Sequence, residues 1–306
     1  MLTIFYKTLK DKKFKESSKM RPGSWINVVA ATSEDLSQVS EITGLQISDL
    51  QDTMDRYELP RVERQEEGVI IYTRYPTDDN DEIATELMTI IITEKYLITI
   101  SPTKNSLVDG LIEKSTSIAT TQKIKLVLRL LLKVAQEFTL KTKQVRNRVP
   151  RGRRELRKIG TSDFIVLTES EEILNQYLSV LIPLNNALEA IIQKKYIIVY
   201  EEDKDILEDL IIAFKQSADL CNVSLKSIRG IRDSYQVIFT NNLNKIIKIL
   251  TVLTILLTIP TMIGGLYGMN VALPFQNHPL AFAYIIWITL LACTITFLIF
   301  YYKKWL

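Results

Sequence analysis

The sequence predicts an α+β domain, in which helices pack on a small sheet, followed by a long stalk helix and two transmembrane helices. Two observations lead to this fold class. Short runs rich in β-branched and aromatic residues are confined to the first hundred residues, and helical periodicity follows them. Charged residues are dense up to Lys245, whereas three lysines are the only charged residues from Ile246 to Leu306.

The N-terminal region predicts a sheet with helices between its strands. The predicted strands, each short and rich in β-branched or aromatic side chains, are residues 2–6, 25–29, 69–75, 86–92 and 96–101. Residues 32–43 and 47–55 are predicted to be helices, and Thr32 offers an N-cap for the first of them. A small sheet with these helices packed on it accounts for this order of elements.

Helical periodicity replaces the strands from Lys104 onward. The predicted helices are residues 106–117, 122–148, 162–193 and 203–267. Between Leu207 and Asn242, one face of the last helix repeats in alternating steps of three and four, which is a heptad pattern. Two interpretations remain open for this face: a seam between long helices, or an amphipathic helix packed within its own subunit.

Two apolar runs, residues 249–267 and 280–302, are each about the 20 residues that a helix needs to cross a bilayer. The alternative is a pair of buried helices in a soluble core. Lysines flank the outer limits of the pair, at Lys245, Lys248, Lys303 and Lys304, whereas residues 268–279 between the runs contain no lysine or arginine. Positive charge stays on the inner side, so both termini are predicted to be cytoplasmic and the protein to lie in the plasma membrane.

These limits divide the chain into predicted parts. They are a cytoplasmic α/β and helical domain (1–202), a stalk (203–245), a first transmembrane helix (246–267), an extracellular loop (268–279), a second transmembrane helix (280–302) and a basic tail (303–306).

Several function classes find little support in the residues. The arginine-rich run 141–158 has no interleaved aromatic residues, so contact with solvent or anionic lipid is favoured over nucleic acid. Cys221 and Cys293 lack disulfide or zinc spacing. With His278 as the single histidine and no visible nucleophile–base arrangement, we expect no enzyme activity. A Gly-rich phosphate loop is also missing, and no organic cofactor is expected.

The first apolar run offers a candidate pore lining. Its polar and small residues recur at steps of three and four, and so share one helix face: Thr251, Thr254, Thr258, Thr261 and Gly265. Two spans cannot enclose a pore, so several chains would surround a common axis. The threonine hydroxyls could face that lumen, or they could bond back to their own helix.

The loop between the spans carries no carboxylate. Magnesium releases its water shell reluctantly, and a site that strips it normally supplies carboxylates. A ring of neutral amide oxygens, such as Asn270 from each subunit, could instead hold the hydrated ion through its waters. Near the inner end, rings of Ile247 and Leu250 could close a pore by dewetting.

The segment Tyr267-Gly268-Met269-Asn270, at the end of the first of two C-terminal spans, resembles the signature of the CorA magnesium transport family. Leu59-Pro60-Arg61-Val62-Glu63 resembles that family's Arg-Pro-Lys/Arg-Val-Glu segment, and Lys303-Lys304-Trp305-Leu306 resembles the ends of its members. The order of elements agrees along nearly the whole chain.

The resemblance implies a funnel-shaped homopentamer in the lipid bilayer. Its activity would be passive, potential-driven uptake of hydrated Mg²⁺, with Co²⁺ and Ni²⁺ as further candidates, and cytoplasmic Mg²⁺ would hold it closed. The implied selectivity filter is Gly268, Met269 and Asn270. The pore-lining and gate positions are Asn244, Ile247, Leu250, Thr258 and Thr261, to which the threonine stripe adds Thr254. The implied regulatory metal ligands are Asp52 and Asp209.

The sequence departs from the family pattern at the gate and the outer loop. Thr258 stands where many members have methionine, and Pro260 is one place from its aligned position. Residues 271–275 replace a Met-Pro-Glu-Leu segment, so an acidic outer ring is missing. These departures bear on the gate chemistry and the metal preference. Two other functions also stay open: a Zn²⁺ transporter of the same fold, and a membrane-anchored sensor that signals through its stalk.

Overall fold

A computed structural model describes residues 1–77, 85–113, 118–149, 161–194, 196–197, 199–274 and 278–305. These residues form two compact units, Met1–Ile231 and Arg232–Leu306, which we call the N-terminal unit and the C-terminal unit. The long helix α7 (Lys204–Tyr267) contributes to both units. Residues 150–158 of the arginine-rich run lie outside the described residues.

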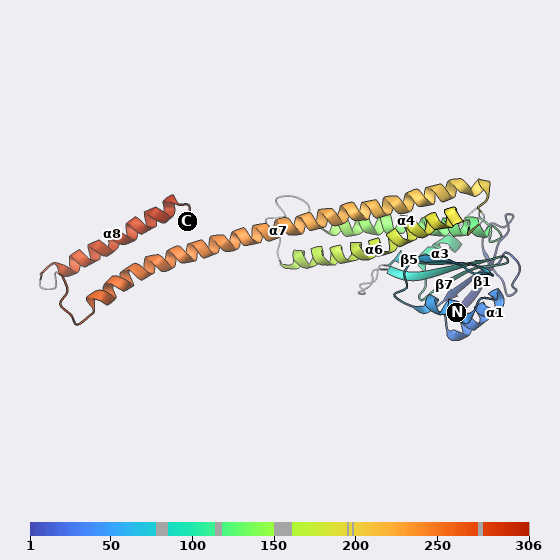
Figure 1. The fold of residues 1–306 in the computed structure, drawn as a ribbon, viewed down its shortest axis with the longest axis horizontal. Helices are drawn as coiled ribbons and strands as arrows, with labels where there is room; N and C mark the ends of the chain where they lie inside the picture. Colours follow the sequence, from blue (N-terminus) through green and yellow to red (C-terminus); the bar gives the residue numbers. More distant parts are fainter. Residues whose placement is uncertain are drawn as a thin grey trace. The chain divides into compact units, whose positions relative to one another are not determined.

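The N-terminal unit contains a mixed seven-stranded sheet (Figure 1). Its strands are β1 (Leu2–Tyr6), β2 (Lys15–Glu16), β3 (Trp25–Val29), β4 (Arg61–Arg64), β5 (Gly68–Pro76), β6 (Thr85–Thr93) and β7 (Leu97–Ser101). They are ordered β2-β1-β3-β7-β6-β5-β4, and the β3–β7 pair is parallel while the other pairs are antiparallel. The five predicted strands are thus confirmed within one or two residues at each end.

Two edge strands, β2 and β4, were not predicted. The prediction was wrong for β4 because its four residues, Arg61 to Arg64, are mostly charged and follow a proline. An edge strand has one paired neighbour and an open side, so it can carry charge where a central strand needs apolar side chains.

Both faces of the sheet are covered, because neighbouring residues of its central strands point to opposite sides. Ile70 and Ile91 belong to the cluster packed under α1 (Ser33–Thr43) and α2 (Ile47–Gln51). Ile71 and Ile90 belong to the cluster packed under the larger helices. Those helices are α3 (Ser106–Glu113), α4 (Lys123–Arg148), α6 (Thr161–Lys194) and the first part of α7. Figure 1 shows α3, α4 and α6 on one side of the sheet and α1 on the other.

The predicted N-cap of α1 is present. The Asp35 amide donates to the Thr32 hydroxyl at 3.2 Å, and the Thr32 amide donates to the Asp35 carboxylate at 3.0 Å. The hydrogen bond from the Thr32 backbone holds the pKa of Asp35 below its usual value. Helix α1 ends at Gly44, whose φ of 79° lies in the left-handed region that glycine tolerates.

The heptad face of α7 packs within its own chain over its first half. Phe214 and Cys221 are fully buried, and Leu225 and Ile228 belong to the same cluster with α4 and α6. The interpretation as an amphipathic helix packed in its own subunit is therefore correct for this stretch. Farther along, Phe239 is 58% exposed in the single chain.

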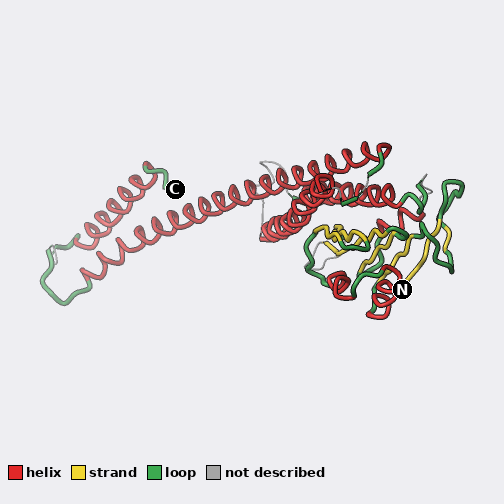
Figure 2. The backbone as a smooth tube through the Cα atoms, turned by 45° about the vertical axis from the view of Figure 1, so that its right-hand side comes forward, coloured by secondary structure: helices red, strands yellow, loops and turns green. Residues whose placement is uncertain are grey.

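The C-terminal unit consists of the end of α7 and helix α8 (Ala281–Tyr302), which lie side by side (Figures 1 and 2). They run antiparallel, since Lys248 lies over the ring of Trp305 at 6.0 Å and Cys293 contacts the Leu256 carbonyl. Both helices are long and apolar enough to cross a membrane. None of the residues of α8, all of them described, is buried in the single chain, unlike the residues of a core helix.

Candidate ion pathway and regulatory site

In the C-terminal unit, α7 turns one face toward α8 and leaves the opposite face open. Val252 is buried, and Leu256, Ile259 and Ile263 are half-buried along the face toward α8. At about 100° per residue, the positions on the opposite side are those predicted to line a pore. They are Ile247, Leu250, Thr254, Thr258 and Thr261, all exposed in the single chain, with Asn244 exposed at the margin of this face.

Each threonine of the stripe donates its hydroxyl hydrogen to the carbonyl four residues earlier. The distances from Thr251, Thr254, Thr258 and Thr261 are 2.8, 2.9, 2.7 and 2.9 Å. The hydroxyls therefore do bond back to their own helix. Because a hydroxyl oxygen has two lone pairs in addition to its hydrogen, each of these oxygens can still accept a hydrogen bond from outside the helix.

The segment Gly268-Met269-Asn270 follows directly on the last turn of α7. The Gly268 amide donates to the Gly264 carbonyl at 3.0 Å, and the Met269 amide donates to the Leu266 carbonyl at 3.3 Å. A methyl group on Gly268 would come within 3.3 Å of the Gly264 carbonyl oxygen, so the chain passes close to the helix end here. The C-terminal end of a helix carries about half a negative charge, which favours a cation beside this segment.

Pro260 interrupts the hydrogen bonding of α7, since it has no amide hydrogen for the carbonyl of Leu256. The thiol of Cys293 on α8 lies 3.8 Å from that carbonyl oxygen and donates to it. A thiol is a weak donor, but in an apolar surrounding a free carbonyl is costly. Cys293 thus links α8 to α7 at the Leu256 carbonyl.

We expect Cys293→Ala to lower the stability of the protein in detergent by about 1 kcal/mol, because the Leu256 carbonyl loses its donor. In a Pro260→Ala background the main-chain amide of residue 260 can satisfy this carbonyl, so Cys293→Ala should then cost much less. Thermal unfolding of the two single variants and the double variant measures the difference. An equal cost of Cys293→Ala in both backgrounds would contradict the assignment.

The predicted regulatory aspartates lie on different elements of the N-terminal unit. Asp52 begins the short 3-10 helix η1 (Asp52–Met54) after α2, and its side chain is 49% exposed. Asp209 lies on the exposed face of α7. Within the part of the chain that the structure describes, no three His, Cys, Asp or Glu side chains converge enough to hold a metal ion. A metal at either aspartate would therefore need ligands from another chain or from water.

Asp52 already has a cationic partner. The Arg61 Nη2 donates to Asp52 Oδ2 at 2.6 Å, and Arg61 Nε donates to Glu63 Oε1 at 2.7 Å. The same guanidinium also contacts Glu58. Burial alone would lower the pKa of Arg61, but the hydrogen bonds to Glu63 and Asp52 raise it above its ordinary value. Sequence reasoning noted Arg61 as part of a motif and missed this contact.

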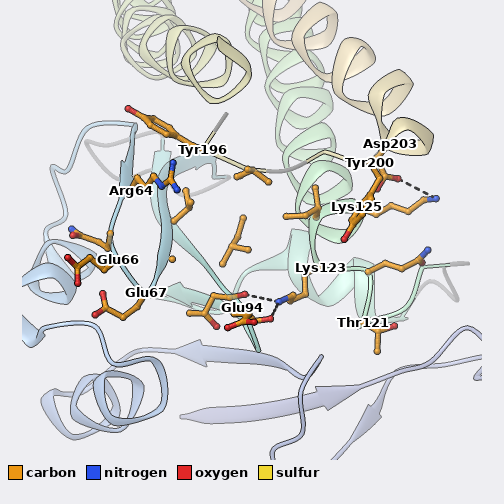
Figure 3. Close-up of a pocket in the computed structure, with 18 of the residues that line it drawn as sticks. Arg64, Glu66, Glu67, Glu94, Thr121, Lys123, Lys125, Tyr196, Tyr200 and Asp203 are labelled. Carbon is orange, nitrogen blue, oxygen red and sulfur yellow. Dashed lines mark hydrogen bonds and ion pairs between the residues drawn. The ribbon is translucent and has the colours of Figure 1, made fainter. Parts of the chain in front are cut away.

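A cavity of about 860 Å³ lies between the β4–β5 turn, the end of β6, the start of α4 and the segment before α7 (Figure 3). Lys123 donates to the Thr93 carbonyl at 2.7 Å and also contacts the Glu94 carbonyl. Lys125 lies 3.6 Å from Asp203. These contacts join α4 to the sheet and to the residue just before α7, so we interpret this region as a structural junction. The sequence did not predict this junction. Its one unusual feature there is a pair of lysines in the first turn of a helix, where acidic residues are usual.

The comparisons with known proteins agree with the fold and with the C-terminal motif. The family described as "CorA-like Mg2+ transporter protein" matches residues 23–304. The cobalt/magnesium transport protein CorA of Methanocaldococcus jannaschii is 27% identical over 294 residues, which cover 91% of this chain and 88% of that protein.

Solved structures give the same answer for the fold. The complete CorA magnesium transporter of M. jannaschii matches with a TM-score of 0.81 and 22% identity, over 100% of this chain and 99% of that one. The full-length CmaX protein matches with a TM-score of 0.74 and 11% identity, over 96% and 97%. The family match spans most of the sequence, and the resemblance predicted from residues 267–270 is confirmed. This chain belongs to the CorA-like Mg²⁺ transporter family.

Proposed function

We propose that this chain forms a homopentameric channel in the plasma membrane that conducts hydrated Mg²⁺ passively into the cell. The observation that carries the proposal is the open face of α7, which presents hydroxyl oxygens from Thr254 to Thr261 and leads to Gly268-Met269-Asn270. Membership of a transporter family disfavours the membrane-anchored sensor.

The chemistry of this face suits a cation that keeps its water. Water bound to Mg²⁺ points its hydrogens outward, so a lining for the hydrated ion must accept hydrogen bonds. The threonine oxygens can do so because their own hydrogens are used within α7. The side-chain oxygen of Asn270 can do so as well, beside a helix end of partial negative charge. Stripping the ion would be costly, since Mg²⁺ dehydrates reluctantly.

Several chains are needed to enclose such a pathway. Two helices cannot surround a pore, and the same face also exposes Ile247 and Leu250, which are 52% and 60% accessible in the single chain. Around a common axis, these side chains would form apolar rings that close by dewetting. The number five comes from the family resemblance.

Orientation and driving force follow from charge. Lysines lie beside the inner ends of both helices, which favours cytoplasmic termini and an extracellular loop. A divalent ion then gains about 4.6 kcal/mol per 100 mV on entering a negative interior, twice the value for a single charge. This gain makes a nucleotide-driven step unnecessary.

Regulation is proposed to come from Mg²⁺ bound between subunits at Asp52 and Asp209. Both side chains are accessible in the single chain, and neither belongs to a cluster that could hold a metal without further ligands. Ions shared between neighbouring subunits would hold the assembly closed, and their loss at low cytoplasmic Mg²⁺ would release it.

The ion preference is tested by flux into vesicles that contain the purified protein. We expect uptake of Mg²⁺, and of Co²⁺ and Ni²⁺ to a lesser extent. Cobalt(III) hexammine resembles hydrated Mg²⁺ and cannot shed its ligands, so it should block uptake if the filter binds ions through their shell. Zn²⁺ flux in preference to Mg²⁺, without block by the hexammine, would favour the Zn²⁺ transporter of the same fold. Absence of flux for every ion would reject the channel.

A further inference from the structure

The guanidinium of Arg61 lies at the centre of a group of three carboxylates. It contacts Asp52 at 2.6 Å and Glu63 at 2.7 Å, and it also contacts Glu58. These residues come from the start of η1, from β4 and from the turn between them. One positive charge therefore faces three negative charges, and the group keeps a net charge of about −2 when all four residues are ionised.

Surrounding contacts hold this guanidinium in place. It lies 4.1 Å from the centre of the Tyr72 ring, a distance typical of a cation–π contact. Tyr72 is buried, and its hydroxyl donates to the Asp49 carbonyl at 2.9 Å. The buried Arg74 donates to the carbonyls of Arg56 and Glu58 at 2.7 and 3.3 Å. The turn and the tyrosine thus fix the position from which Arg61 reaches Asp52.

We propose that Arg61 is a built-in competitor of Mg²⁺ for Asp52, and that it sets the cytoplasmic Mg²⁺ concentration at which the channel closes. The proposal rests on the proposed regulatory role of Asp52. Because this cation is part of the chain, it is beside the carboxylate at any Mg²⁺ concentration, and its Nη2 donates to Oδ2 of Asp52. Mg²⁺ must therefore displace the guanidinium or share the carboxylate with it, which lowers the affinity of the regulatory site.

The charge balance gives the direction of the effect. If Arg61 is removed, Asp52 loses its partner and the net charge of the group changes from about −2 to about −3. Both changes raise the affinity of the site for Mg²⁺. If Arg61 instead only positioned Asp52 for metal binding, its removal would weaken Mg²⁺ binding. The two roles thus predict shifts of opposite sign.

The test is Arg61→Gln in the full-length protein, with Mg²⁺ titrated against both flux closure and protection from proteolysis. We expect the Mg²⁺ midpoint to fall about two- to fivefold in both measurements, the range for a partly exposed ion pair. Arg64→Gln is the matched control, because Arg64 lies exposed on the same strand beside the cavity of Figure 3 and its loss changes the net charge equally. Its midpoint should move much less.

Arg61→Lys provides a second variant that keeps the charge but cannot contact three carboxylates through a planar fork. Its midpoint should lie between those of the wild type and Arg61→Gln. If Arg61→Gln fails to assemble, Arg61→Lys alone tests the proposal, and an Arg61→Lys midpoint at or above the wild-type value overturns it. An unchanged or raised midpoint in Arg61→Gln, or an equal shift in Arg64→Gln, overturns it as well.

Asp52→Asn and Asp209→Asn separate this inference from the function on which it rests. If neither variant alters closure by Mg²⁺, the regulatory site itself is wrong, and with it the role of Arg61. If both variants weaken closure while Arg61→Gln leaves the midpoint unchanged, the site stands and only the competition is rejected.

Discussion

Asn270→Ala is expected to abolish selective Mg²⁺ uptake while leaving the assembly intact. The side chain follows the last turn of α7 and is exposed in the single chain, so its loss leaves no cavity in a core. In a pentamer the substitution would remove five amide oxygens from one ring. A loss of more than 1.4 kcal/mol in the binding of the hydrated ion at this ring already reduces its affinity more than about tenfold.

The measurement is Mg²⁺ flux in vesicles, with and without cobalt(III) hexammine. The matched control is Asn241→Ala, which removes an exposed amide from α7 on the side opposite the predicted pore face. We expect the control to conduct and to be blocked as in the wild type. Unchanged and hexammine-sensitive Mg²⁺ flux in Asn270→Ala would remove Asn270 from the filter.

The membrane helices could be predicted from the sequence because composition alone distinguishes them. The loss of charge after Lys248 and the return of lysine at Lys303 mark their outer limits, and both α7 and α8 end where the pattern placed them. The central strands were equally clear, since a strand buried on both faces is rich in apolar and β-branched residues, as Ile90 to Ile92 of β6 are.

Edge strands and contacts between distant residues could not be predicted in this way. The mostly charged sequence of β4 is compatible with a strand or a loop, and only its pairing with β5 shows that it is a strand. The Cys293 thiol meets the Leu256 carbonyl, 37 residues away, because of the antiparallel register of two helices. Neither a cysteine nor a leucine in an apolar helix indicates such a contact from the sequence.

In the candidate site, too, the sequence predicts which residues share a face but not which contacts they make. Spacing places the threonines of α7 on one face, but the direction of each hydroxyl depends on a rotamer. Asp52 and Arg61 are nine residues apart, and their ion pair depends on the turn that Arg74 holds through two carbonyls. A motif can therefore indicate Asp52 as a candidate site residue, whereas its ion pair with Arg61 is visible only in the structure.

The double variant Asp52→Ala with Asp209→Ala should keep conduction intact and raise the Mg²⁺ needed for closure by more than tenfold. Both side chains lie on the surface of the single chain, so the substitutions remove charge without opening a core. Each closed subunit interface would lose two carboxylates that hold its ions. Flux in vesicles at a series of internal Mg²⁺ concentrations measures the shift, and Asp219→Ala, an exposed aspartate on another side of α7, is the control.

The two single variants should differ, because their carboxylates start from different states. Asp209 lies exposed on α7, whereas Asp52 shares its charge with Arg61 at 2.6 Å. If Arg61 competes with Mg²⁺, Asp52 already contributes less than a free carboxylate, and Asp209→Ala should raise the closure midpoint more than Asp52→Ala. In an Arg61→Gln background this inequality should shrink, since Asp52 is then available to the ion. Loss of transport together with loss of assembly in the double variant would instead identify the two aspartates as structural residues of the subunit interface.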